Sequence, residues 1–139
     1  MSAFHNRTEL FEIGREDCIH LLASRRVGRI AFVAEGQPLV FPVNYGMDGE
    51  TIVFRSDAGT KLTHAPLTKV AFEVDDIDEA NGEGWDVVVQ GHADDITDAI
   101  DEHSEILRDL PLHPFPPGLK WHWVRIVPTA ITGRRIIAR

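Results

Sequence analysis

Short apolar segments separated by turns run along most of this chain, and this pattern constrains its fold more than any other feature. The segments are rich in β-branched and aromatic residues, which favour strands. They cover residues 29–34, 39–45, 51–56, 69–74, 85–96 and 121–126, and residues 131–137 continue the last one. Because short turns connect neighbouring antiparallel strands, we expect a mostly antiparallel sheet. Six strands in a chain of 139 residues are expected to close into a barrel, so the predicted fold is mainly β.

A few short helices are expected to flank these strands. Residues 16–24 predict a helix that turns Leu22 toward the core. A second helix is expected to begin after Thr97, a good N-cap residue, and to end before Pro111. Residues 60–67 predict a third, shorter helical segment.

Two strands contain residues that interrupt regular pairing. Pro42 has no N–H to donate, so it predicts an edge, a bulge or a backbone that faces a ligand. Gly91, in the middle of the fifth strand, predicts a bulge or a close backbone approach. Between the fourth and fifth strands, residues 75–83 predict a long acidic loop.

Composition narrows the class of protein. No repeat or linker divides the chain, so residues 1–139 are expected to form one domain, and 43% hydrophobic residues indicate a globular one. No apolar run approaches the roughly 20 residues that span a bilayer. The net charge of −8 argues against binding to nucleic acid or acidic lipid. Cys18 is the only cysteine and no signal-peptide pattern is present, so we expect a cytoplasmic protein in which Cys18 is a small core residue.

The third strand runs into a loop that gathers groups able to bind an anion. Arg55, Ser56, Thr60 and Lys61 supply cationic and hydroxyl donors, and Gly59 allows a tight backbone with free N–H groups. These are the donors that a phosphate requires. An ordinary polar surface loop has the same composition, so both interpretations stay open at this point. The Walker pattern is absent, which argues against a nucleotide triphosphatase.

Histidines and tryptophans give weaker signals. The seven histidines show no metal-type spacing, and no Gly-x-Ser-x-Gly elbow supports Ser/His/Asp catalysis, so we expect neither a metal site nor a serine hydrolase. His122 stands between Trp121 and Trp123, and Trp85 opens the fifth strand. Such tryptophans line an aromatic cofactor or pack in a core or a dimer contact.

Glu73 is the carboxylate inside an otherwise apolar strand at residues 70–74. If its side chain is buried, it needs a partner such as an arginine or a hydroxyl group. Arg134 and Arg135 are candidates for that partner, for a ligand contact, or for an exposed pair.

Several short motifs follow one another in a specific order. They are Gly28 to Phe32, Pro42 to Tyr45, Phe54 to Ser56 with Gly59 to Leu62, Val70 to Asp75, Gly84-Trp85 with Val89 to Ala93, and Ile131 to Arg135. In this order and spacing the chain resembles the pyridoxamine 5′-phosphate oxidase-like family of flavin-binding split barrels. The resemblance covers nearly the whole chain from Arg15. It is to the small bacterial members, which include the nitroimidazole-reductase-like proteins.

The resemblance implies a six-stranded antiparallel split β-barrel, a homodimer, and FMN bound in a cleft between the subunits. The residues that match the family's phosphate and ribityl contacts are Arg55, Ser56, Thr60 and Lys61. Those that match the border of the isoalloxazine ring, by backbone and side chain, are Val43, Asn44 and Tyr45. Trp85 matches the strand that approaches the flavin from the partner subunit.

Two departures from the family pattern limit the activity that we expect. The C-terminal Arg-x-His pattern of true pyridoxamine phosphate oxidases is absent, and Ile131 to Ile137 stands in its place. The nitroimidazole-type histidine is absent at the position of Arg55. We therefore expect an FMN-dependent oxidoreductase of unknown substrate, with no catalytic side chain assigned. The alternatives are a deazaflavin-dependent reductase, a non-enzymatic flavin-binding protein and, third, a haem-handling protein.

Overall fold

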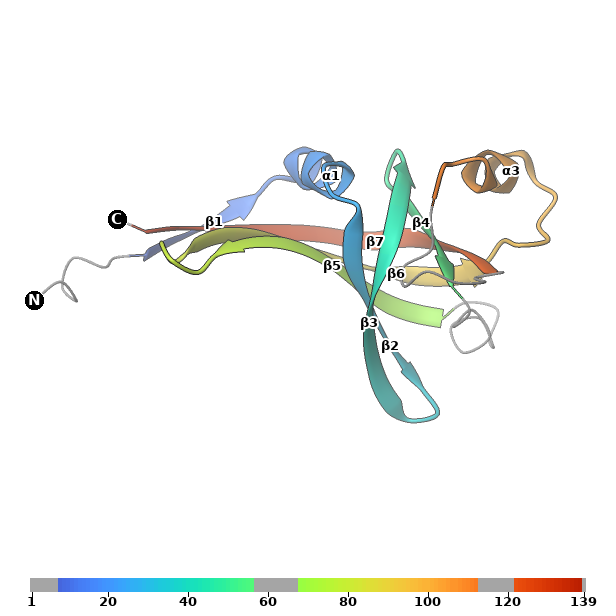
Figure 1. Cartoon of the computed structure of the whole chain (residues 1–139), viewed down its shortest axis with the longest axis horizontal. Coiled ribbons are helices and arrows are strands. Elements are labelled where there is room, and N and C mark those ends of the chain that lie inside the picture. Colours follow the sequence, from blue (N-terminus) through green and yellow to red (C-terminus); the bar gives the residue numbers. More distant parts are fainter. Residues whose placement is uncertain (1–7, 57–67, 113–121, 139) are drawn as a thin grey trace, which may run out of the picture.

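The computed structural model describes residues 8–56, 68–112 and 122–138. Figure 1 shows the strands and helices of this part, which form one barrel with two short helices on the same side. In chain order they are β1 (Thr8–Ile13), α1 (Arg15–Ala23), β2 (Val27–Ala34), β3 (Gln37–Asp48), β4 (Thr51–Ser56), β5 (Thr68–Asp78), β6 (Glu83–Asp95), α3 (Glu102–Arg108) and β7 (His122–Ala138).

Six of the seven strands close into a ring, which confirms the predicted antiparallel barrel. Hydrogen-bonded neighbours follow the order β7-β4-β3-β2-β5-β6, and β6 pairs back with β7. All of these pairings are antiparallel. β1 lies outside the ring and pairs with the C-terminal part of β7. The sequence pattern did not predict β1, because its side chains are mostly exposed and show no buried stripe.

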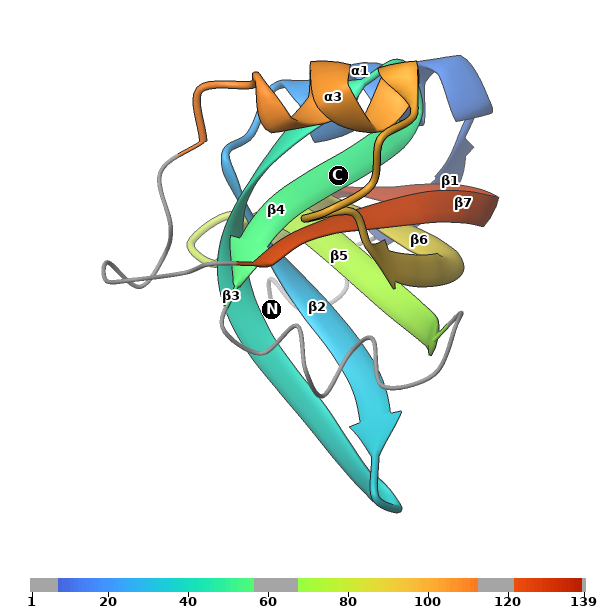
Figure 2. The same ribbon diagram turned by 90° about the vertical axis from the view of Figure 1, so that its right-hand side faces the viewer.

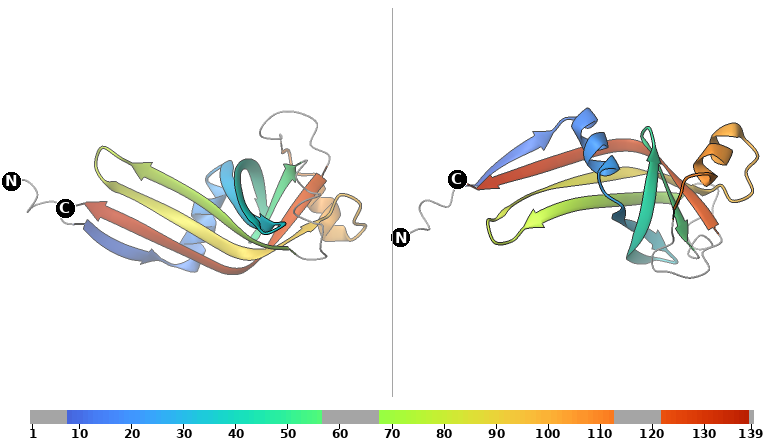
Figure 3. Two further views of the ribbon diagram at one scale, coloured as in Figure 1. Left: turned by 90° about the horizontal axis from the view of Figure 1, so that it is seen from below. Right: turned by 45° about the horizontal axis from the view of Figure 1, so that its top comes forward.

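β7 is one long strand and includes residues 127–130, which lie between the two predicted segments. β6 pairs with β7 along most of its length, and β4 pairs with residues 122–126. β1 pairs with residues 133–138, at the other end of the strand. Figure 3 shows the result: β1, β5, β6 and β7 extend side by side, away from the end of the barrel where α3 lies. β7 therefore connects the two ends of the molecule.

A bulge bends the β6–β7 pair at Gly91. Gln90 faces Ala130 but Gly91 faces Pro128, so one residue of β7 has no partner across the ladder. A Cβ atom on Gly91 would lie 2.3 Å from the carbonyl oxygen of Val127. Only glycine tolerates so close a backbone, which confirms the predicted close approach.

Alternate residues of the strands fill the barrel. In β5, Val70, Phe72 and Val74 are buried, and the residues between them are more exposed. Phe72 meets Tyr45 of β3 edge to face, with ring centroids 4.9 Å apart. Burying one such apolar side chain stabilises the fold by about 1.5–3 kcal/mol. The period of two along the strands thus produces a core that is continuous from strand to strand.

α1 packs against β7 through Cys18, which is fully buried, as is Leu22 of the same helix. A Cβ on Gly133 of β7 would lie 2.6 Å from Sγ of Cys18, so the missing side chain lets the helix approach the strand. The role of Cys18 as a small core residue is confirmed. The helix starts at Arg15, one residue before the predicted start.

Pro42 lies where β3 has only one neighbour. β3 pairs with β2 up to Asn44 and with β4 from Tyr45 onward. The N–H of Tyr45 donates to the carbonyl of Arg26, so the backbone nitrogens of alternate residues in β3 face β2 and the nitrogen of Pro42 faces away. The missing N–H therefore costs no ladder bond, and the predicted edge position is confirmed.

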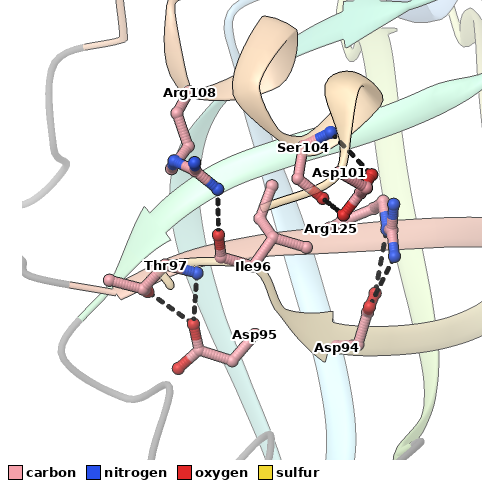
Figure 4. A network of polar contacts seen from close by, with 8 residues as sticks. All are labelled: Asp94, Asp95, Ile96, Thr97, Asp101, Ser104, Arg108 and Arg125. Atoms are coloured by element: carbon pink, nitrogen blue, oxygen red, sulfur yellow. Dashed lines mark hydrogen bonds and ion pairs between the residues drawn. The ribbon is translucent and has the colours of Figure 1, made fainter. Parts of the chain in front are cut away.

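The predicted N-cap of the second helix was wrong. Asp101, not Thr97, caps α3: its carboxylate accepts hydrogen bonds from the N–H of Ser104 at 3.0 Å and from its hydroxyl at 2.7 Å. Thr97 is bonded to Asp95 instead, and its Oγ1 accepts the N–H of Trp123 at 2.9 Å. Figure 4 shows the Asp101 cap and the contact between Thr97 and Asp95. Since Thr97 ties the end of β6 to β7, the helix begins later.

The predicted acidic loop at residues 75–83 is also mostly strand. β5 continues to Asp78, and β6 starts at Glu83. A short turn joins them, with Gly82 at a positive φ of 64° and the side chain of Asn81 bonded to Asp78. Ladder hydrogen bonds to β6 outweigh the low strand preference of the aspartates.

Two further expectations concern membranes and metals. In the described residues, no helix is long and apolar enough to cross a bilayer. Within the same residues, no three His, Cys, Asp or Glu side chains gather as a metal-ligand group.

Candidate functional site

Two of the four predicted phosphate residues, Arg55 and Ser56, lie at one end of the barrel, where β4 ends and β7 begins. Thr60 and Lys61 fall between residues 57 and 67, outside the described residues, so their role stays a prediction. Arg55 and Ser56 are the last two residues of β4, opposite Trp123 and His122 of β7. Figure 2 shows this end, with β4 running down to the start of β7 beneath α3. We call this end the barrel mouth and define it by six residues: Arg55, Ser56, Asp95, Thr97, His122 and Trp123.

Arg55 and Ser56 point to opposite faces of the sheet, because successive side chains of a strand alternate. The guanidinium of Arg55 lies 5.2 Å from the ring centre of Trp123 and donates to the carbonyl of Leu112 at 3.4 Å. Ser56 faces the barrel interior with Phe54 and is only 5% exposed. The two predicted phosphate donors thus approach the barrel mouth from different sides.

His122 and Asp95 form a pair at the barrel mouth that sequence reasoning missed. Nδ1 of His122 lies 2.5 Å from Oδ2 of Asp95. The other carboxylate oxygen, Oδ1, accepts the N–H of Thr97 at 2.8 Å and also its hydroxyl. Burial acts to raise the pKa of Asp95, but the hydrogen bonds from Thr97 and His122 outweigh it and hold that pKa below its usual value. Asp95 is therefore an ionised carboxylate that fixes the imidazole ring.

α3 and the segment after it brace the outer side of the barrel mouth. Arg108 of α3 donates to the carbonyl of Ile96 at 2.5 Å. Beside it, Arg125 of β7 holds Asp94 of β6 in a two-bonded ion pair, at 2.6 and 3.1 Å (Figure 4). The hydrogen bonds to Asp94 raise the pKa of Arg125 above its usual value. These contacts fix the ends of β6 and β7 relative to one another.

A groove lies on the outer face of the barrel, near the start of β5. Its volume is about 880 Å³, and residues of β2, β3, β5, β6 and β7 line it. Its apolar lining includes Ala31, Val40 and Ala71, whereas Lys69 and His92 give it a polar end. Thr68, the first described residue after residues 57–67, also lines the groove.

The three residues predicted to border the isoalloxazine ring do not share one face. The side chains of Val43 and Tyr45 are buried in the barrel core. The Tyr45 hydroxyl donates to the carbonyl of Leu22, and burial raises the pKa of Tyr45 far above its usual value. Only Asn44, which is half-buried, lies on the outer face of β3, opposite Val27. A flavin on that face could meet Val43 and Tyr45 through their backbone only, and this contact stays a prediction.

Trp85 lies at the other end of the molecule from Arg55. It is 8% exposed and faces the guanidinium of Arg25 at 5.4 Å, which in turn binds Asp76 at 2.7 Å. Trp85 pairs with Arg135 of β7 and Arg55 pairs with Trp123. Twelve residues of extended strand separate those two positions, roughly 40 Å along β7 at about 3.3 Å per residue. Within one chain, Trp85 is not part of the barrel mouth.

Glu73 has an arginine partner, as expected, but it is Arg29. Nη1 of Arg29 lies 2.9 Å from Glu73 and 3.2 Å from Asp75, so one guanidinium serves two carboxylates. Burial and the neighbouring Asp75 raise the pKa of Glu73 to about 7, although Arg29 acts in the opposite direction. Arg134 binds Asp86 at 3.0 Å instead. The three residues Arg29, Glu73 and Asp75 form a charged cluster on the outer face of β2 and β5.

Comparisons with known proteins agree across nearly the whole chain. The model of a family described as pyridoxamine 5′-phosphate oxidase matches residues 14–135. An uncharacterised protein of Mycobacterium tuberculosis is 31% identical over 137 residues, which are 94% of this chain and 88% of that protein. The solved structure of an FAD-binding protein from Mycobacterium smegmatis is 34% identical with a TM-score of 0.66, covering 91% of this chain and 98% of the other. A protein of unknown function from Corynebacterium diphtheriae is 31% identical with a TM-score of 0.73, covering 92% and 98%.

Proposed function

Because the chain belongs to the pyridoxamine 5′-phosphate oxidase family, we propose that it binds a flavin nucleotide and acts as a flavin-dependent oxidoreductase. The observation that carries this proposal is the open groove on the outer face of the barrel, whose lining includes Thr68, the first described residue after residues 57–67. Its volume of about 880 Å³ falls in the range of small-molecule sites. The FAD-binding protein of Mycobacterium smegmatis, at 34% identity, supports a flavin as the ligand.

The lining of the groove fits the two halves of a flavin nucleotide. The isoalloxazine ring is flat and largely apolar, and Ala31, Val40 and Ala71 offer it an apolar wall. The tail carries phosphate, for which the Lys69 ammonium and the Thr68 hydroxyl are suitable donors. The apolar wall and these donors belong to one groove, so a single ligand could use both.

When bound, the flavin would supply the transfer of hydride or single electrons, and the protein would supply binding, orientation and electrostatics. Among the described residues, the groove lining contains no carboxylate, and its titratable side chains are Lys69 and His92. Lys69 would attract the anionic tail and fix its direction. The apolar wall would exclude water from one face of the ring. No acid–base residue is required for these tasks.

A second copy of the chain is expected to complete the site as a homodimer. Val33 and Val40, at the edge of the groove, are 63% and 65% exposed. Exposed apolar side chains beside an open groove are typical of a surface that another protein covers. A dimer over this face would also enclose the ring.

Absorption and fluorescence titration of the purified protein test the proposal. We expect saturable binding of FMN, which is our first choice, with FAD, a deazaflavin and riboflavin as comparison ligands. If FAD binds more tightly than FMN, the preferred ligand would be the same as that of the FAD-binding relative. Binding of the deazaflavin alone would favour the deazaflavin-dependent reductase. A protein that binds none of these ligands would overturn the proposal. Sedimentation at equilibrium with and without flavin would test the dimer.

The alternative of a non-enzymatic flavin-binding protein is favoured by the lack of a carboxylate among the described residues of the groove lining. Mixing the flavin-loaded protein with NADH or NADPH under anaerobic conditions separates the two functions. Bleaching of the flavin absorption at a saturable rate supports an oxidoreductase. A flavin that binds tightly but is reduced no faster than free flavin supports the alternative.

A further inference from the structure

We propose that Arg29 and Glu73 set the charge at the ring end of the groove, so that Arg29 favours the reduced flavin and ionised Glu73 opposes it. The proposal rests on the proposed function and deepens it, because it assigns residues that control the redox behaviour of the same site. Neither residue lines the groove, but both stand next to its apolar wall. The observation behind the proposal is the charged cluster of Arg29, Glu73 and Asp75.

Strand register places Arg29 and Glu73 directly beside the apolar wall. Ala31 of β2 and Ala71 of β5 are opposite each other in the ladder, and both line the groove. Arg29 and Glu73 are also opposite each other, two residues further along the same strands, so their side chains lie on the same face as the alanines. Two residues of strand span roughly 6.6 Å. On the other side of Ala71, two residues away along β5, lies Lys69.

The attachment of the tail decides which edge of a flavin ring would meet this pair. The ribityl tail leaves the isoalloxazine ring from one long edge, and the opposite edge carries N5 and the C4 carbonyl oxygen. With the phosphate directed to Lys69, as proposed above, the N5 edge would point toward Arg29 and Glu73. The Arg29 side chain is 53% exposed, so a ligand in the groove could reach its guanidinium.

Reduction changes the charge of the ring at this place. A hydride from a nicotinamide donor brings two electrons and one proton, so a neutral oxidised ring becomes a reduced ring with one negative charge, and the donor is oxidised by two electrons. A guanidinium beside the ring stabilises that negative charge, and an ionised carboxylate destabilises it. The balance between Arg29 and Glu73 therefore shifts the reduction potential of the bound flavin.

The charge of Glu73 changes near neutral pH. Burial and the neighbouring Asp75 raise the pKa of Glu73 to about 7, although Arg29 acts in the opposite direction. Val88, directly opposite Glu73 in β6, carries no charge. Among the described residues, the other charged or titratable side chains on this face of β2, β5, β6 and β7 are Arg29, Lys69, Asp75, Asp86, His92 and Arg134.

The reduction potential of bound FMN, measured by anaerobic reduction beside a reference dye, tests the role of Glu73. Glu73→Gln removes the charge of the carboxylate and keeps its shape. At pH 8 we expect the variant to prefer reduced over oxidised FMN by up to about tenfold more than wild type does, a potential about 30 mV higher for a two-electron couple. At pH 5.5, where the wild-type carboxyl is protonated, the two potentials should be equal. Equal potentials at pH 8 would overturn the inference.

The role of Arg29 is tested in the Glu73→Gln background, where no carboxylate at position 73 can change its charge. Adding Arg29→Gln should lower the potential at pH 8, and an unchanged potential would overturn the inference. Arg15→Gln is the matched control, because Arg15 is 51% exposed and binds Glu50 at 2.7 Å. Glu79→Gln is the control for the carboxylate. Controls that shift the potential as much as the cluster variants would show an effect of total charge and would also overturn the inference.

Failure of the inference and failure of the proposed function look different. If the wild-type protein binds no flavin, the proposed function fails and this role fails with it. If the wild type binds FMN and its potential is the same in Glu73→Gln at both pH values, only the role of the cluster fails. Circular dichroism at pH 5.5 and pH 8 would show that each variant is folded.

Discussion

Replacing Glu73 with glutamine should stabilise the flavin-free protein at alkaline pH. Glu73 shares Arg29 with Asp75, at 2.9 and 3.2 Å, and burial with the nearby Asp75 raises its pKa from 4.5 to about 7. The folded protein therefore keeps the carboxyl proton of Glu73 up to about pH 7, whereas the unfolded chain releases it near pH 4.5. Between those values the folded state binds more protons, so its stability falls as pH rises.

The size of this loss of stability follows from the shift in the pKa of Glu73. At 1.36 kcal/mol per pKa unit, a rise from 4.5 to about 7 corresponds to an upper bound of about 3 kcal/mol. The Glu73 side chain is 29% exposed, so solvent screening reduces this to about 1–2 kcal/mol. Glutamine has the shape of the protonated acid and cannot ionise. Glu73→Gln should therefore not lose stability as the pH rises. Arg29 keeps Asp75 as its partner in the variant.

Thermal unfolding of wild type and Glu73→Gln across pH 4.5 to 8 measures this difference. We expect nearly equal Tm values at pH 4.5 and a variant Tm about 3–8 °C higher at pH 8. Glu79→Gln, in the exposed turn between β5 and β6, is the matched control and should change neither value. A Glu73→Gln protein that is less stable than wild type at pH 8 would show that the ion pair with Arg29 outweighs burial and the repulsion from Asp75, which would refute this reasoning.

Two further substitutions test the barrel. Tyr45→Phe removes the hydroxyl that donates to the buried carbonyl of Leu22, so it should lower the free energy of unfolding in urea by about 1–3 kcal/mol while leaving flavin affinity unchanged; an unchanged urea midpoint would contradict the buried bond. Gly91→Ala would put a Cβ 2.3 Å from the Val127 carbonyl oxygen and should cost about 2 kcal/mol or more. Gly14→Ala, whose Cβ would meet nothing within 4 Å, is its control. Because Gly14 is the N-cap of α1, this variant should lose up to about 1 kcal/mol.

Local patterns were sufficient to predict most of the barrel. Strand positions follow from alternating burial, which a single strand records in its own sequence; β4 was predicted with its observed ends, Thr51 and Ser56. The predictions that failed depend on partners far along the chain. Thr97 has the side chain of an N-cap, but its hydrogen bonds go to Asp95 and Trp123, and the pairing that brings β7 alongside it cannot be read from residues near position 97.

The same reason limits what the sequence reveals about the site. Glu73 was expected to need a partner such as an arginine or a hydroxyl group. The partner is an arginine, but it lies 44 residues earlier in the chain, at Arg29, and not near the C-terminus. His122 and Asp95 are 27 residues apart and become neighbours only because β6 pairs with β7. A pattern of residue types can state what kind of partner a buried charge requires. Strand register decides which residue that is.

The length of β7 constrains how a complete flavin site could be built. Arg55 and Trp85 were both matched to the flavin, yet in one chain they face positions 123 and 135 of β7, roughly 40 Å apart along the strand. No flavin nucleotide spans that distance. If both residues contact one flavin, they must come from different chains, arranged so that the β5–β6 end of one copy lies over the barrel mouth of the other. A flavin-loaded protein that sediments as a monomer would therefore remove either Arg55 or Trp85 from the site.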